Sequence, residues 1–383
     1  MSKNVSPCLA LVLSGGGIRA MVFHLGVLRY LAERGALEHV HRLSTVSGGS
    51  LLVGLLLQQS NYEWPSSRRY ISDVYPALRD QLCARSLQWG AVRQLLKPWN
   101  WRYLLSRANL LGLALEKEWG VVRKVSALPT SPELSINGTT AENGKRFRFK
   151  RDSIGDYSIG YASPRNFPLS SALAVSAAFP GGFGPLVLRA NRFEWRRRGW
   201  NAPIGSEKVV DIGYKKLHLY DGGVYDNLGL EPFFDAGRGA PKHAGEKIIV
   251  SDAGAPLRPG FSGFAINPWR LKRVADIMSE QSRALRVRAF AHYLQSNPGQ
   301  GAYVYIDTPV TAESPRQCRQ ASFASCYPTT LRRPTLRNFD AIAEHGYQVA
   351  AKIEAEFGLG LSVESLPPSL RGAYNSSENS MLE

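Results

Sequence analysis

The chain has 383 residues, and its hydrophobic fraction of 44% is typical of a folded protein with a buried core, which excludes extensive disorder. A formal net charge of +16 attracts anions such as phospholipid headgroups and nucleotides, although a basic surface that serves only solubility is the alternative. The sequence contains no zinc-finger spacing and no RNA-recognition signature, so nucleic acid is not an expected partner.

Cysteine usage and the apolar runs bear on location. The four cysteines form no CxxC pair and are irregularly spaced, which is typical of a reduced, intracellular protein. The N-terminal apolar run CLALVL is too short for a signal peptide, and no run is long enough for a transmembrane helix. We therefore expect a cytoplasmic protein with peripheral contact to the inner face of an anionic membrane.

The first sixty residues alternate strand and helix signals. The apolar run 8–13 ends in glycines and predicts a buried parallel strand. Apolar residues three and four apart over 18–34 predict a helix that Gly35 ends. HRLSTV (41–46) predicts a second strand and SLLVGLLLQQ (50–59) a buried helix, so the chain opens as a parallel α/β layer structure.

A tryptophan-rich segment interrupts this pattern between residues 61 and 130, where we expect a helical insertion. Its aromatic and basic residues are Trp64, Trp89, Trp99, Trp101 and Trp119, with Arg93, Lys97, Arg102 and Arg107. They are compatible with an anionic membrane surface, and equally with a helical subdomain that packs on the core.

The rest of the chain returns to strands and helices. The predicted elements are strands at 133–140, 145–151 and 247–254, a short helix opening 169–185, a strand and tight turn at 216–230, and long helices at 268–294 and 335–357. The helix 268–294 is rich in arginine, which predicts a solvated face.

Glycines 15, 16 and 17 follow the first predicted strand in SGGGIRA (14–20). They allow a tight turn and leave backbone amides beside a helix N-terminus, where negative charge is favoured. These amides can cradle a phosphate or stabilise a developing oxyanion. The spacing does not fit the Walker A pattern, with its Gly-Lys-Ser/Thr, and it does not fit G-x-G-x-x-G, because position 20, where the third glycine would stand, is alanine.

Two further turns carry residues that suit nucleophilic catalysis. Ser47 in TVSGG lies in a nucleophile-elbow pattern, G-x-S-x-G, with Thr45 in place of the first glycine; a purely structural serine is the alternative. Asp221 in YDGGVYDNLG ends a predicted strand and precedes two glycines; an ordinary Asp-Gly turn is the alternative. None of the seven histidines has the sequence context of a triad histidine, and we expect His24 to be structural.

The order of these motifs is more specific than any one of them. GGGxR, the S-x-G elbow, AVSAAFPGGFGP and DGGVYDNLGL follow one another within residues 8–255. In this order they resemble the patatin-like phospholipase family, and SGGGIRAMVFHLGVLRYL…STVSGGS looks like its bacterial members. The resemblance implies an α/β fold, a three-layer α/β/α sandwich with a mainly parallel central sheet. It implies one acyl hydrolase domain at 7–360, with the helical insertion at about 61–130 and a polar tail at 361–383.

The resemblance also implies the residues of a catalytic site. Ser47 corresponds to the nucleophile and Asp221 to the aspartate of a Ser-Asp dyad, so no histidine, metal or cofactor is expected. The expected oxyanion hole comprises Gly15, Gly16, Gly17, Arg19 and Gly48. The chain departs from the family pattern at Thr45 and Ala20, where glycine is usual, and both replacements are small.

The implied reaction is hydrolysis of fatty-acyl esters of phospholipids or lysophospholipids through an acyl-enzyme intermediate. Other functions remain open: an acyltransferase or thioesterase with the same dyad, a phospholipase effector activated by a nucleotide, or a module that binds an anionic ligand without catalysis. The Ser47 and Asp221 motifs, together with the glycine loop, favour the enzyme, because a binding module needs none of them.

Overall fold

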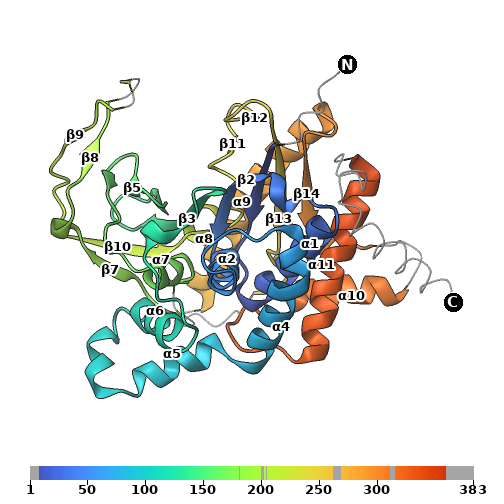
Figure 1. Ribbon diagram of the computed structural model, residues 1–383, viewed down its shortest axis with the longest axis horizontal. Helices are drawn as coiled ribbons and strands as arrows, with labels where there is room; N and C mark the ends of the chain where they lie inside the picture. The colour runs from blue at the N-terminus through green and yellow to red at the C-terminus, as the bar shows by residue number, and fades with distance from the viewer. Residues whose placement is uncertain are drawn as a thin grey trace.

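A mixed sheet lies at the centre of the protein, with helices on both faces (Figure 1). The computed structural model describes residues 8–180, 182–199, 202–203, 205–261, 269–310 and 315–358. The predicted polar tail, residues 361–383, lies outside these ranges.

Parallel strands form one side of the described sheet, beginning at the edge strand β14. Their spatial order is β14 (Gly301–Tyr305), β13 (Glu246–Asp252), β1 (Cys8–Leu13), β2 (Val40–Val46) and β3 (Glu133–Thr140). The interior of β1 is buried throughout, as expected for a parallel strand covered on both faces. Because the strands are parallel, β1, β2 and β13 end on one edge of the sheet, which we call the carboxyl edge. Functional loops of α/β proteins follow this edge.

Antiparallel strands extend the sheet beyond β3. One path continues through β4 (Arg146–Phe149), β5 (Ile154–Asp156), β6 (Gly160–Ala162), β8 (Arg196–Arg197) and β9 (Lys208–Val209). On another path β10 (Lys216–Asp221) pairs with β3 and with β7 (Leu186–Arg189). A separate ribbon joins β11 (Phe234–Asp235) and β12 (Ala240–Pro241). The sequence predicted β4 and β10 but not the other strands of this part.

Helices cover the two faces of the sheet with separate apolar clusters. On one face, Leu9 and Leu11 belong to the cluster shared with α1 (Gly17–Glu33), α2 (Gly48–Gln59) and α11 (Leu336–Phe357). On the other face, Ala10 and Val12 pack with Phe290 of α9 (Trp269–Ser296). This arrangement confirms the predicted three-layer α/β/α fold.

Short helices occupy residues 61–130 and the connections. In the insertion they are α3 (Ser67–Arg69), η2 (Tyr70–Val74), α4 (Tyr75–Ala84), α5 (Leu87–Leu95), η3 (Pro98–Tyr103), α6 (Ala108–Lys117) and η4 (Val125–Ala127). Elsewhere they are η1 (Leu37–His39), α7 (Leu169–Ser176), η5 (Ala190–Arg192), α8 (Gly223–Asp226) and α10 (Pro315–Cys326).

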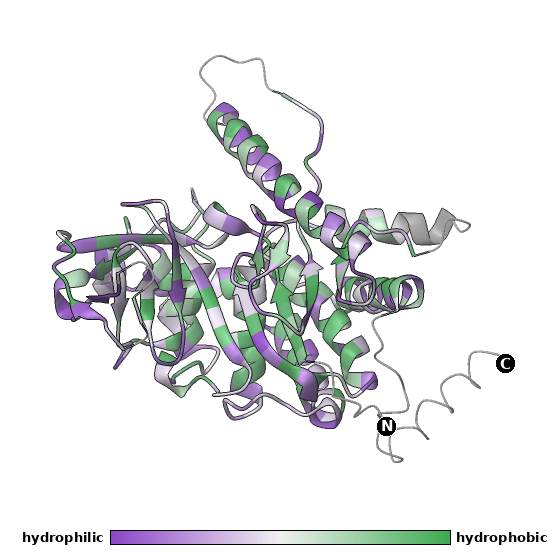
Figure 2. Ribbon diagram, turned by 90° about the horizontal axis from the view of Figure 1, so that it is seen from above, coloured by the Kyte–Doolittle hydropathy of each residue, from purple (hydrophilic) through white to green (hydrophobic). Residues whose placement is uncertain are grey.

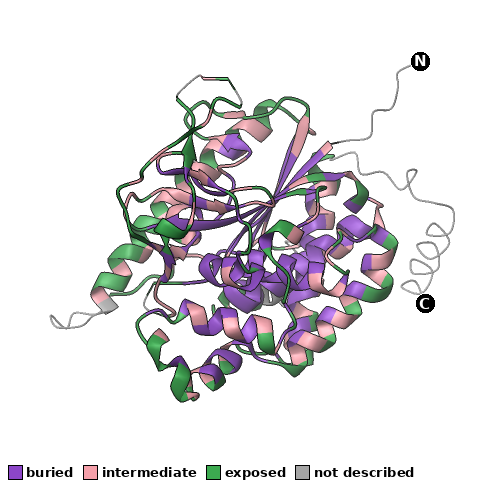
Figure 3. Cartoon of the chain, turned by 60° about the vertical axis from the view of Figure 1, so that its left-hand side comes forward, coloured by how far each residue is buried: buried purple, intermediate pink, exposed green. Residues whose placement is uncertain are grey.

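The insertion contains both a part that packs on the core and a part with exposed aromatic residues. Leu82 of α4 and Leu111 of α6 are fully buried, and Trp119 is almost so, which is subdomain packing on the core. Trp99 and Trp101 are exposed, and the turns around them are among the green segments at the bottom of Figure 3.

Helix α9 projects from the body at its N-terminal end (Figure 2). The sequence predicted that its arginines form a solvated face, and this is wrong for two of them. Arg283 pairs with Asp252, which is fully buried at the end of β13, and Arg286 donates to the Tyr225 carbonyl at 3.2 Å. These arginines therefore anchor α9 to the carboxyl edge. Within the described part of the chain, no helix combines the length and apolarity needed to cross a bilayer.

Candidate active site

Strand register brings the two predicted catalytic residues to the same level of the sheet. Val46, the last residue of β2, pairs with Asn137 of β3. The next residue of β3, Gly138, pairs with Asp221 at the end of β10. Ser47 follows Val46 directly, so it lies across β3 from Asp221, and its hydroxyl is close enough to the Asp221 carboxyl group to lower the pKa of that group.

Ser47 occupies a strained turn between β2 and α2. Its backbone angles are φ 50° and ψ −116°, in a region that residues with a side chain rarely adopt. Such strain costs on the order of 1–3 kcal/mol and is found where surrounding structure imposes it. This is the geometry of a nucleophile elbow, which holds the serine hydroxyl at the head of a helix.

The glycines of the elbow are required by close backbone approach. A Cβ at Gly48 would lie 2.3 Å from the Gly17 carbonyl oxygen, and one at Gly49 would lie 2.5 Å from the Leu13 carbonyl oxygen. No side chain fits at either position. The elbow therefore packs directly against the glycine loop that follows β1.

Buried hydroxyl groups support the elbow from the side of β3. The backbone N–H of Ser47 donates to Ser176 Oγ at 3.0 Å, and Ser176 Oγ donates to the Asn137 carbonyl at 2.6 Å. Ser50 Oγ lies 2.8 Å from Ser176 Oγ and donates to Thr45 Oγ1 at 2.8 Å. Thr45, the departure from the glycine of the elbow pattern, thus has a partner for its hydroxyl group.

If Ser47 is the nucleophile, we expect Ser176→Ala to lower kcat by about ten- to a hundredfold with little change in KM for a soluble ester, because the Ser47 backbone loses the hydrogen bond that positions it. Steady-state kinetics on such an ester checks this. Ser170→Ala is the matched control, since Ser170 is equally buried on α7 but makes no side-chain hydrogen bond among the described residues. Equal losses in both variants, or a loss confined to KM, would contradict a positioning role.

The glycine loop presents backbone amides beside Ser47. Within the described residues, the N–H groups of Gly16, Gly17 and Gly48 have no acceptor. They stand at the N-termini of α1 and α2, where backbone N–H groups have no partner within the helix. Gly15 differs, because its N–H donates to the Asn227 carbonyl at 3.0 Å. A Cβ at Gly15 would also lie 3.0 Å from Ser47 Cβ, so Gly15 serves close packing while the other three amides are available.

Arg19 and His24 support the loop from below. Arg19 is buried and donates through Nε to the Ala253 carbonyl at 3.1 Å and through Nη1 to the Tyr327 carbonyl at 2.7 Å. Burial lowers its pKa to about 10, so it stays charged at neutral pH. His24 is fully buried between Ser251 Oγ, at 2.7 Å, and the Ser14 carbonyl, at 3.0 Å. Burial lowers its pKa to about 4, which fits the structural role predicted for it.

Asp221 is a buried carboxylic acid with few compensating contacts. Its side chain is almost fully buried and accepts a hydrogen bond from the Gly223 N–H at 2.7 Å. Burial raises the pKa of Asp221 to about 7, and the hydrogen bond from Gly223 and the nearby Ser47 hydroxyl offset only part of this shift. An ordinary aspartate has a pKa near 4 and is a poor base at pH 7. A pKa near the working pH is the best value for a general base.

Sequence reasoning missed two residues of this site. Ser176 stands in the AVSAAFP motif, but only the fold shows that it supports Ser47. Asn227 stands six residues after Asp221, and its side-chain oxygen lies beside both Gly15 and Gly223, where a Cβ would come within 2.2 and 2.7 Å of it. The motifs contain both residues, yet nothing in their spacing assigns these contacts.

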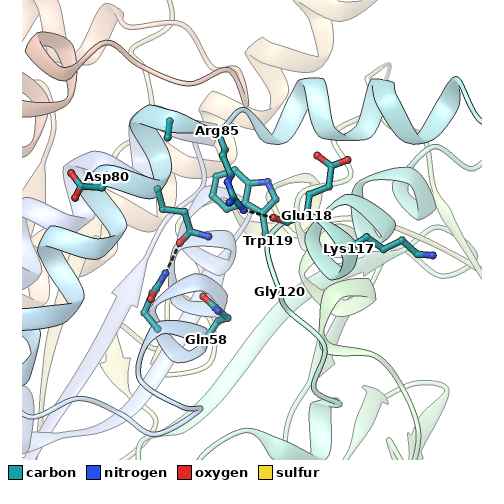
Figure 4. Close-up of a pocket in the computed structure, with 10 residues that line it drawn as sticks. Gln58, Asp80, Arg85, Lys117, Glu118, Trp119 and Gly120 are labelled. Atoms are coloured by element: carbon teal, nitrogen blue, oxygen red, sulfur yellow. Dashed lines mark hydrogen bonds between the residues drawn. The ribbon is translucent and has the colours of Figure 1, made fainter.

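A pocket of about 610 Å³ lies elsewhere, among residues that include Gln58, Arg85 and Trp119 (Figure 4). Gln58 is at the far end of α2, about 15 Å along the helix from the elbow. This pocket is therefore separate from the Ser47 and Asp221 site.

The comparisons with solved structures concern the fold. Human GIVD cytosolic phospholipase A2 superposes with a TM-score of 0.52 and 14% identity over 96% of this chain and 62% of that chain. The same human protein in complex with methyl gamma-linolenyl fluorophosphonate and terbium chloride gives 0.50 and 15%, over 96% and 59%. This chain thus spans about 60% of the human protein, and the likeness shows a shared fold. A search of curated protein sequences found no match.

The comparison with protein families concerns the motifs. The model of the patatin-like phospholipases matches residues 11–234, which is more than half of the chain. The matched range contains the glycine loop, Ser47 and Asp221. The chain therefore belongs to the patatin-like phospholipase family.

Proposed function

We propose that this chain is a serine acyl hydrolase that cleaves fatty-acyl esters of phospholipids or lysophospholipids. The observation that carries the proposal is the placement of Ser47, held in a strained elbow, across β3 from the buried Asp221, whose pKa is about 7. Family membership supports a lipid substrate.

In the proposed acylation step, ionised Asp221 accepts the hydroxyl proton of Ser47 while Oγ attacks the ester carbonyl. The carbonyl oxygen becomes an oxyanion, and the N–H groups of Gly16, Gly17 and Gly48 donate to it. Each such donor is worth about 2.7–4 kcal/mol in other serine hydrolases. The buried charge of Arg19 lies under the same loop and favours the oxyanion. The C–O bond to the alcohol then breaks, and Asp221 returns the proton to the departing alkoxide.

Deacylation repeats these steps with water. Asp221, again ionised, takes a proton from the water that attacks the acyl-enzyme carbonyl. The Ser47 ester bond breaks, Ser47 recovers the proton, and the fatty acid leaves. The ester and one water are consumed, and one alcohol and one fatty acid are formed.

Release of free fatty acid from mixed phospholipid vesicles tests the proposed function. We expect release by the wild-type protein without added nucleotide. Release that requires a nucleotide would favour the activated effector. No release from phospholipids or lysophospholipids, with or without nucleotides, would contradict the proposal.

We also propose that the enzyme acts in the cytoplasm and that its net charge of +16 attracts it to the inner face of an anionic membrane. Raising ionic strength from about 0.01 to 1 M shortens the Debye length from about 30 to 3 Å. We therefore expect the hydrolysis rate on anionic vesicles to fall by about tenfold or more over this range. The rate on neutral phosphatidylcholine vesicles is the control and should change little. A salt-insensitive rate on anionic vesicles would remove charge as the means of recruitment.

A further inference from the structure

Large apolar side chains are exposed together on one part of the insertion. Leu105 is 92% exposed, Leu96 72% and Trp99 69%. Trp101, Leu104 and the nearby Phe179 are each more than half exposed. We call these six residues the apolar rim. Soluble proteins rarely expose so many large apolar residues in one place unless the surface contacts a partner or a membrane.

Contacts connect the apolar rim to the catalytic dyad. Ser106, next to Leu105, donates through Oγ to the Pro185 carbonyl at 2.7 Å. The segment that begins after α7 and leads to Pro185 carries Phe179. At its start, Ala178 accepts from the Asp221 N–H at 3.2 Å, and Ser176 accepts from the Ser47 N–H. The rim therefore adjoins the carboxyl edge on which Ser47 and Asp221 lie.

The charges around the rim favour one kind of occupant. Residues 87–107 contain Arg93, Lys97, Arg102 and Arg107 but no acidic residue, and of these Arg93 is ion-paired with Glu118. Arg102 and Arg107 are exposed, and the Arg102 guanidinium lies 4.8 Å from the Tyr103 ring. Tryptophan and arginine together are typical of the interface between lipid headgroups and acyl chains. A second copy of this chain would bring the same basic surface against itself, which repels.

From these contacts and charges, and on the basis of the function proposed above, we propose that the apolar rim inserts into the surface of an anionic phospholipid bilayer. Trp99, Trp101 and Leu105 would enter the headgroup and upper acyl region, while Arg102 and Arg107 would contact lipid phosphates. This orientation turns the carboxyl edge toward the membrane, so an acyl ester reaches Ser47 with little exposure to water.

Vesicle binding by the inactive Ser47→Ala protein tests the surface without hydrolysis. Vesicles of phosphatidylcholine with phosphatidylglycerol are sedimented with Ser47→Ala and with Ser47→Ala carrying Trp99→Ala and Leu105→Ser. We expect the rim substitutions to weaken binding by about tenfold or more, because each removes a large side chain that the bilayer would bury. The thermal unfolding midpoint should not change, because both residues are exposed.

The matched control is Phe357→Ser in the same Ser47→Ala protein. Phe357 is 58% exposed, as is Trp101. It lies far from the rim, because the next residue, Gly358, is near Gly299, which precedes β14 at the edge of the sheet opposite to the carboxyl edge. Vesicle binding that survives the rim substitutions, or that falls equally in the control, would overturn the proposal. So would rim substitutions that abolish self-association of the protein but leave vesicle binding unchanged. If the double substitution unfolds the protein, Leu96→Ser alone should still weaken binding. Fatty-acid release by the wild type is scored separately, so a failed hydrolase assay leaves the binding result interpretable.

Discussion

Ser47→Ala is expected to lower kcat for fatty-acid release by about four to six orders of magnitude, as loss of the nucleophile does in other serine hydrolases. The substitution removes only Oγ. The Cβ that packs beside Gly15, and the N–H that donates to Ser176, both remain. Release of fatty acid from phospholipid vesicles by wild type and variant, side by side, measures the effect. Activity comparable to the wild type would exclude the proposed mechanism.

Two further serine variants separate loss of chemistry from loss of fold. Ser126→Ala changes an exposed serine outside the site and should leave activity unaltered. Ser47→Gly should be as inactive as Ser47→Ala yet more stable by about 1 kcal/mol, because glycine tolerates the φ of 50° at this turn. Denaturant unfolding measures the stability difference. An inactive variant that is also more stable than the wild type cannot owe its inactivity to misfolding.

The sequence predicted the parallel part of the fold because its elements are long and strongly periodic. The apolar run at 8–13 and the helix period over 18–34 correspond to β1 and α1 within one residue at each end. Most strands beyond β3 went unpredicted because they have only two to four residues, which is too short to show alternation. Residues 301–305 also form an unpredicted strand, β14, whose pairing with β13 depends on tertiary contact.

The motifs predicted the residues of a candidate site, but they could not predict the electrostatic properties of those residues. Glycine spacing cannot show that the N–H of Gly15 donates to Asn227, while those of Gly16 and Gly17 have no acceptor among the described residues. A sequence cannot show that Asp221 is buried, so the ordinary pKa was the natural expectation. Burial is a property of the assembled β3, β10 and α7, which meet at this carboxyl group.

Asp221→Asn is expected to lower kcat by about four orders of magnitude, because the amide cannot accept the proton of Ser47. The wild-type pH profile should identify the same group. The proposed mechanism needs ionised Asp221, so kcat/KM should rise with pH and reach half its maximum near pH 7, the pKa of the buried carboxyl. Below that pH it should fall about tenfold per unit. An inflection near pH 4, or a profile without one, would contradict the role of Asp221 as the base.

Asp226→Asn is the matched control, because Asp226 is as buried as Asp221, five residues later in the same turn. Its carboxylate accepts from the N–H groups of Leu228 and Glu231, so its loss should cost stability but leave most of the activity. Asp221→Asn should have the opposite effect on stability. The pKa of Asp221 is higher in the folded chain than in the unfolded chain, so the folded state binds more protons between about pH 4 and 7. The stability that Asp221 contributes is fully present below about pH 4 and is lost as the pH rises through 7, because the buried carboxyl then ionises. Asparagine does not ionise, so Asp221→Asn avoids this loss of stability. We expect Asp221→Asn to be inactive but more stable than the wild type at pH 8, and Asp226→Asn to be active but less stable. This pair of results would show that the carboxylate needed for activity is that of Asp221.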